Sequence, residues 1–161
     1  MLDNLKGSHL VASWGVTVAL GWIATIAMAV MQMSVMKVML AWTVLMAVPV
    51  LMTVKLYMDG DSNKLFNFWA VIVTVLMVEN FVTPASVAVY SYFLLWIIAG
   101  AVGFYYTSTK LPPPSDKIYR YGAIASAIAV PVVFHNFRTG AILGLITQAV
   151  PMLYDYQKVH R

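Results

Sequence analysis

Long apolar runs separated by short polar stretches make up almost the whole chain. The first run, 10–58, would form a helix about 73 Å long, more than twice the ~30 Å hydrocarbon core of a bilayer. Gln32, Ser34 and Lys37 form the one clear polar interruption in this run. We therefore predict that the chain turns back there.

The remaining runs are shorter and are bounded by polar or turn-forming residues. A hydrophilic loop covers 57–64, Thr83 and Pro84 are typical of a helix start, and 108–117 contains three consecutive prolines. His135-Asn136-Phe137-Arg138 forms a polar turn between the last two runs. The pattern predicts six helices, at residues 10–33, 37–58, 65–82, 84–107, 119–135 and 138–154.

Composition places these helices in a membrane. The chain has 161 residues, of which 61% are hydrophobic and only 10% are charged, whereas soluble domains carry roughly 25% charged residues. A soluble domain of this size has too small an interior to bury so much apolar surface. The predicted fold class is therefore an all-α integral membrane protein, a six-helix transmembrane bundle forming one domain over 1–161. The polar residues 1–9 are expected to form an interfacial tail.

The basic residues predict the orientation of the bundle. With six spans and a cytoplasmic N-terminus, eight basic residues lie inside and only Lys37 and Arg138 lie outside, which agrees with the positive-inside rule. If the last segment did not cross, the distribution would fall to six against four. Seven of the nine tyrosines also fall at the predicted inner ends, at the headgroup level that amphipathic rings prefer. Both termini are therefore expected in the cytoplasm, with the protein in the cell membrane.

Few polar residues lie in or beside the predicted spans, and these are the candidates for a substrate or ion path. Ionisable residues in spans are costly and often mark such paths, which points to Glu79, near the outer end of the third helix. The neutral polar residues Asn80, beside it, and Gln148, in the sixth helix, are further candidates. His135 and Arg138 join them at the outer turn. Each also has a structural interpretation. Glu79 could reach headgroup water or form an ion pair with Arg138 or Lys37, His135 could bond backbone or headgroups, and Gln148 could hydrogen-bond between helices.

Small residues spaced four apart predict close helix packing. They are Gly122 and Ser126 in the fifth helix and Gly140 and Gly144 in the sixth. Phe66, Phe68 and Trp69 open the third helix and are expected at a membrane interface.

Several classes of function are excluded by residue content. The chain has no cysteine, which excludes disulfides, thiolate metal sites and thiol redox chemistry. Its three histidines have no partner at metal-ligand spacing. We find no haem, zinc or nucleotide signature and no catalytic motif, so an enzyme is not expected. The basic residues are dispersed singly, whereas nucleic-acid binding requires a basic patch or stripe.

One stretch resembles a transporter family. Asn136, Gly140, Gly144, Gln148 and Tyr154 are similar to the last helix of SWEET-type sugar transporters. The Pro-Gln dipeptide typical of that family is missing, because Pro49 is followed by Val50 and Pro151 by Met152. The likeness covers one helix of six and assigns no family.

Two functions fit these observations. The first is a channel or carrier for an ion or small solute, lined by the third, fifth and sixth helices and working as a homo-oligomer, since six such helices form a pore only with difficulty. The alternative is a non-catalytic structural or accessory subunit packed among unlike membrane subunits, which suits the sparse polar content and the eleven methionines.

Overall fold

A computed structural model describes residues 4–61, 63–83 and 85–159, and for 4–8, 80, 85–92, 134, 137 and 159 it describes the backbone alone. Throughout these ranges the regular structure is helical, with no strand. The elements are α1 (Asn4–Val30), α2 (Val35–Met58), α3 (Lys64–Val82), α4 (Ala85–Ser108), α5 (Ser115–His135), α6 (Phe137–Gly144), the π-helix η1 (Leu145–Ala149) and α7 (Val150–Val159).

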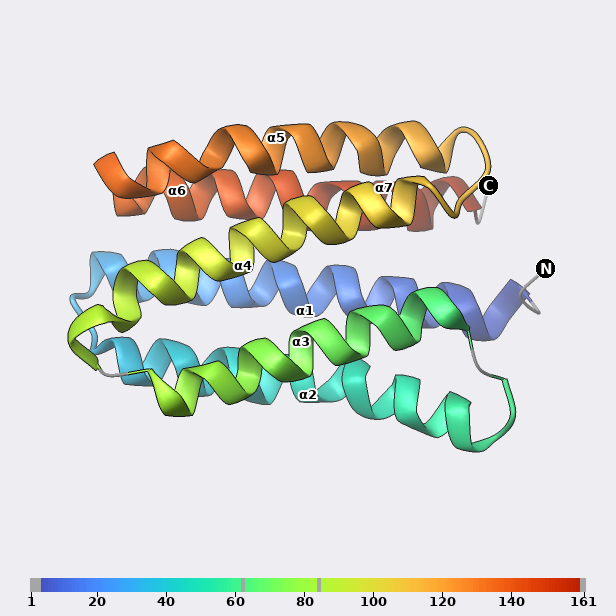
Figure 1. The fold of residues 1–161 in the computed structure, drawn as a ribbon, viewed down its shortest axis with the longest axis horizontal. Helices are drawn as coiled ribbons and strands as arrows, with labels where there is room; N and C mark the ends of the chain where they lie inside the picture. The colour runs from blue at the N-terminus through green and yellow to red at the C-terminus, as the bar shows by residue number, and fades with distance from the viewer. Residues whose placement is uncertain (1–3, 62, 84, 160–161) are drawn as a thin grey trace.

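Because α6, η1 and α7 follow one another without interruption, the described chain forms six helical rods. The rods run back and forth along one long axis, and the beginning of α1 and the end of α7 lie at the same end of the bundle (Figure 1). We call this the terminal end, and the end formed by the α1–α2, α3–α4 and α5–α6 turns the opposite end. The expected all-α class and the number of helices are confirmed.

The six rods close into a ring. Each rod contacts the next one along the chain, and the last rod returns to pack against α1 through α6, η1 and α7. The most extensive contact joins α4 and α5. The first and last elements of the sequence are therefore neighbours, and residues far apart in the chain share one interior.

Several helix boundaries differ from the expectation. Residues 4–9, expected in a polar tail, belong to α1; α5 begins at Ser115 and has 21 residues, and the last rod extends to Val159. Polar residues such as Asp116 and Lys158 continue these helices, because no glycine or proline interrupts them there. The fifth and sixth helices are thus longer than hydrophobicity alone predicts.

The expected turn between the first two helices is found at residues 31–34. Gln32 takes a left-handed backbone conformation there, with φ of 53°. This position is filled by glutamine, although glycine adopts the left-handed region more readily. The sequence therefore shows no glycine signal at the turn.

Helix α1 shows how the core is built. Leu10, Trp14, Val18 and Trp22 recur every four residues, and all four are buried. This spacing places them on one face of the helix. The opposite face is also apolar, with Val16, Leu20 and Ile23 exposed. A helix that is apolar on every side is typical of a protein interior or a membrane.

In the described residues, two stretches are long and apolar enough to cross a membrane by length and composition, His9–Val30 and Val35–Met58. Both lie near the N-terminus, and the core helix of a soluble protein or a signal sequence passes the same test. Phe93–Ser108 is a shorter apolar helix.

Candidate functional site

The interior of the ring is aromatic. Trp14, Trp22, Trp42 and Trp96 are at most 5% exposed, and Trp69 is partly buried among Trp14, Phe68 and Phe104. Phe66 is buried as well. The side chains of Phe66 and Trp69 therefore face the apolar interior of the ring, and the Trp69 indole N–H donates to Thr107 Oγ1 at 3.0 Å. Both residues lie in the first turns of α3, and their position at a membrane interface stays a prediction.

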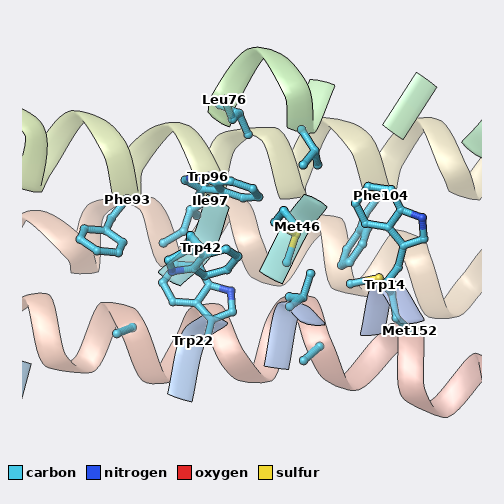
Figure 2. Packing of buried hydrophobic residues seen from close by; sticks show 14 of the residues in the cluster. Trp14, Trp22, Trp42, Met46, Leu76, Phe93, Trp96, Ile97, Phe104 and Met152 are labelled. Carbon is cyan, nitrogen blue, oxygen red and sulfur yellow. The ribbon is translucent and has the colours of Figure 1, made fainter. Parts of the chain in front are cut away.

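Three tryptophans fill the interior toward the opposite end. The Trp42 ring lies 5.3 Å from that of Trp22, edge-on, and 4.6 Å from that of Trp96, and Phe93 packs against Trp22 (Figure 2). The Trp42 indole donates to Thr25 Oγ1 at 2.9 Å. We call Trp22, Trp42, Phe93 and Trp96 the aromatic plug.

Gln148 connects this plug to the last rod. Its side chain is 4% exposed and lies about halfway along the rod. Its Oε1 accepts a hydrogen bond from the Trp22 indole at 3.1 Å, and its Nε2 donates to the carbonyl oxygen of Trp96 at 3.0 Å. One amide thereby joins α1, α4 and η1.

Local backbone geometry brings Gln148 into this position. It lies in the π-helical turn η1, followed by Pro151, which has no N–H and leaves the Thr147 carbonyl without its usual helical donor. Across the interface, a Cβ added at Gly100 would lie 2.2 Å from Gln148 Nε2. Only glycine at position 100 leaves room for the amide. π-helical turns are often found at functional sites.

A cavity of about 280 Å³ extends from Gln148 toward the terminal end. Residues of α1, α3, α4, α5 and the last rod line it, together with Leu111 and Pro112 of the α4–α5 loop. Trp14, Trp69, Trp96 and Phe104 supply aromatic walls, and Gln148 lies at the inner limit. We call this the central cavity. Its size approaches the lower limit of small-molecule sites, roughly 300 Å³.

The terminal end of the central cavity is polar. Asp155 lines it and is 6% exposed. The hydroxyls of Ser115 and Tyr119 both donate to the Asp155 carboxylate. Two helices, α5 and α7, are thus joined by a buried carboxylate that faces the cavity.

The other predicted path residues lie away from the central cavity. Glu79 is at the end of α3, where one carboxylate oxygen accepts from the Thr83 hydroxyl and the other is buried without a hydrogen-bond partner. The ion pair with Arg138 considered above is not formed between these two described residues. The side chain of Asn80 lies outside the described residues.

His135, Asn136 and Arg138 do meet, around a shallow hollow beside Gln32 at the opposite end. The Asn136 side chain caps α6 by accepting from the Thr139 N–H at 3.1 Å. Of the predicted path residues with a described side chain, Gln148 alone lines the central cavity.

The predicted packing residues lie against neighbouring rods. Gly122 faces Phe104 and Pro151, Gly140 faces Val133, and Gly144 faces the Trp22 indole, each so closely that a Cβ would come within 3.0 Å of its neighbour. Ser126 is buried, and its hydroxyl has no hydrogen-bond partner.

Sequence reasoning missed Asp155, Trp14 and the role of the first and fourth helices. A signal for Asp155 was present: Gln148, Met152 and Asp155 follow one another at helical spacing, four and three residues apart. The expected sixth helix ended at residue 154, where the hydrophobic run ends, so Asp155 was expected outside the bundle. No comparable signal relates Trp14 to Gln148, because their proximity depends on ring closure.

Among the described residues, no group of three or more histidine, aspartate or glutamate side chains could hold a metal ion. Comparison of the chain with protein-family models, curated proteins and solved structures finds no match. The geometry of the central cavity is therefore the basis for assigning a function.

Proposed function

We propose that all six rods cross a bilayer, with both termini on the cytoplasmic side of the cell membrane. The support is the outer surface, which is aliphatic on every rod. Exposed side chains on it include Val16, Leu20, Ile23, Val44, Leu51, Val71, Val75, Leu95, Val102, Ile124, Ile128, Ile142 and Ile146. Soluble monomers rarely expose contiguous apolar patches larger than a few hundred Å², whereas lipid solvates such a surface.

Charges and tyrosines support the orientation. Lys55, Lys110 and Lys158 lie in or next to helix ends at the terminal end of the bundle, whereas Lys37 and Arg138 lie at the opposite end. Tyr57, Tyr105, Tyr106, Tyr119, Tyr121, Tyr154 and Tyr156 also gather at the terminal end. This asymmetry is the one that the positive-inside rule associates with the cytoplasmic face.

Single cysteines test the topology, because the chain has none of its own. Thr139→Cys is exposed at the opposite end and Lys117→Cys at the terminal end. In intact cells a membrane-impermeant maleimide should label Thr139→Cys, and should label Lys117→Cys only after permeabilisation. If only α1 and α2 crossed, both positions would be cytoplasmic. Protection of Thr139→Cys in intact cells would therefore reject six crossings.

Within this bundle we propose a carrier that holds a small solute in the central cavity. The observation that carries the proposal is a cavity of about 280 Å³ with mainly apolar walls and a few convergent polar groups, which is the usual make-up of a small-molecule site. The aromatic plug fills the interior beyond Gln148, so a continuous pore is not open. An alternating-access carrier, whose binding site opens to one side of the membrane at a time, fits this arrangement better than a channel.

Thiol reactivity tests whether the cavity admits water and solute. Val73→Cys faces the cavity, and Val75→Cys lies on the same helix with an exposed, outward side chain. Neutral methyl methanethiosulfonate should modify Val73→Cys faster, because a thiol ionises in a hydrated cavity and not in hydrocarbon. Equal or slower reaction at position 73 would reject an accessible cavity.

The cavity also bears on the alternative of an accessory subunit. Unfilled space weakens packing, because the atoms that line it lose van der Waals contacts. A cavity lined with polar groups is therefore not expected in a subunit that serves only for packing. Purification in mild detergent separates the two functions: the carrier is expected without unlike subunits, and consistent co-purification with them would favour the accessory role.

A further inference from the structure

The lining of the central cavity carries negative charge and no positive charge. Of the residues that line it, Asp155 is the only one with a formal charge, and no lysine, arginine or histidine is among them. Asp155 is 6% exposed, at the polar end of an otherwise apolar space. A solute entering this cavity meets one carboxylate and no cation.

The partners of Asp155 leave its charge without a counter-ion. Ser115 and Tyr119 donate neutral hydrogen bonds to it, and within the described residues no basic side chain is bonded to it. Removing a carboxylate from water is costly unless it is paired. A cation bound in the cavity would lower that cost.

The walls of the cavity suit the same kind of ligand. The side chains of Trp14, Trp69, Phe104 and Tyr119 line it, and consecutive rings lie 6.4, 5.7 and 5.3 Å apart between centroids. Aromatic faces attract ammonium groups, and the attraction is stronger once the bound ligand has displaced water from the cavity.

From these observations we infer that the solute is a small organic cation, an amine or quaternary ammonium compound with an apolar body. The cationic group would lie at the terminal end beside Asp155, and the apolar body would extend between the aromatic walls toward Gln148. The inference rests on the proposed solute-binding function and adds the chemical class of the solute.

Ligand binding to the purified full-length protein in detergent tests the charge assignment. The probes are phenyltrimethylammonium and its neutral isostere tert-butylbenzene, and the readout is tryptophan fluorescence, since Trp14, Trp69 and Trp96 line the cavity. Asp155→Asn keeps an oxygen that accepts from Ser115 and Tyr119 but removes the charge. It should weaken phenyltrimethylammonium binding by about tenfold or more, the scale of a desolvated charge contact, and leave tert-butylbenzene binding unchanged.

Asp59→Asn is the matched control, because Asp59 is an exposed acid at the same end of the bundle that does not line the cavity. It should leave the affinity for both probes unchanged. Unaltered phenyltrimethylammonium binding in Asp155→Asn, or an equal loss for both probes, would overturn the inference about charge. The reactivity of Val73→Cys is measured with a neutral reagent, so failure of the charge assignment is distinguishable from failure of the proposed function.

Discussion

At the scale of single residues, the interior depends on a small number of polar side chains. Gln148 is the clearest, because its amide accepts from the Trp22 indole and donates to the Trp96 carbonyl inside the buried interior. A hydrogen bond within a protein contributes about 0.5–1.5 kcal/mol to its stability. Two such bonds from one residue make Gln148 a determinant of helix arrangement as well as a wall of the cavity.

Replacing this side chain tests its contribution. Gln148→Ala should lower the free energy of unfolding by about 1–3 kcal/mol, because it removes both bonds and leaves the buried Trp22 N–H unsatisfied. Denaturant unfolding in a fixed detergent, followed by tryptophan fluorescence, measures the change. Gln157→Ala, on the exposed side of α7, should change stability little. Equal stability of the two variants would contradict the role given to Gln148.

At the scale of elements, two helices approach each other through glycine. Gly100 on α4 faces Gln148 in η1, and Gly103 on the same helix faces the Trp69 ring, with an added Cβ only 2.3 Å from that ring. The two glycines of α4 thus leave room for the Gln148 and Trp69 side chains of the neighbouring rods. The π-helical turn and the two glycines together determine where Gln148 and Trp69 lie.

A double-mutant cycle tests the α4–η1 contact. Gly100→Ala should destabilise the fold by about 1–3 kcal/mol, the usual range for overpacking, because its methyl group displaces the Gln148 amide. In the Gln148→Ala background the same change should cost much less, giving a coupling of about 0.5–3 kcal/mol. The matched control is Gly103→Ala, which meets the rigid Trp69 ring and should cost the same in both backgrounds. Additive effects at position 100 would contradict the contact.

At the scale of the whole molecule, ring closure creates the site. The central cavity is lined by helices from the beginning, middle and end of the same chain. A homo-oligomer, which we expected because six such helices form a pore only with difficulty, is not required for a site of this kind. The number of ligands bound should therefore follow the number of chains.

Native mass spectrometry in detergent measures this stoichiometry. With phenyltrimethylammonium as the probe, each chain should bind one ligand whether the particle contains one copy or several, because each ring encloses its own cavity. Asp155→Asn should reduce occupancy of every copy alike. A ratio of one ligand per two chains would instead place the site between copies.

Much of the fold was predictable from hydrophobic runs and their interruptions. The turn near Gln32 to Lys37, the loop after Met58 and the six helices follow from local chain length and polarity, which tertiary contacts do not alter. Helix ends were less predictable. Polar residues such as Ser115 and Asp155 belong to helices in the structure. Boundaries drawn from hydrophobicity alone had left them outside the helices.

The candidate site was predictable only in part. Gln148 could be identified because a polar residue in an apolar helix is costly and therefore has a role. The sequence by itself determined an all-helical chain with apolar surfaces and one end rich in basic residues, because these properties are local and additive. Ring closure alone decided that five tryptophans face inward, that Asp155 faces a cavity and that Glu79 does not, because these facts depend on which helix faces meet across large separations in the chain.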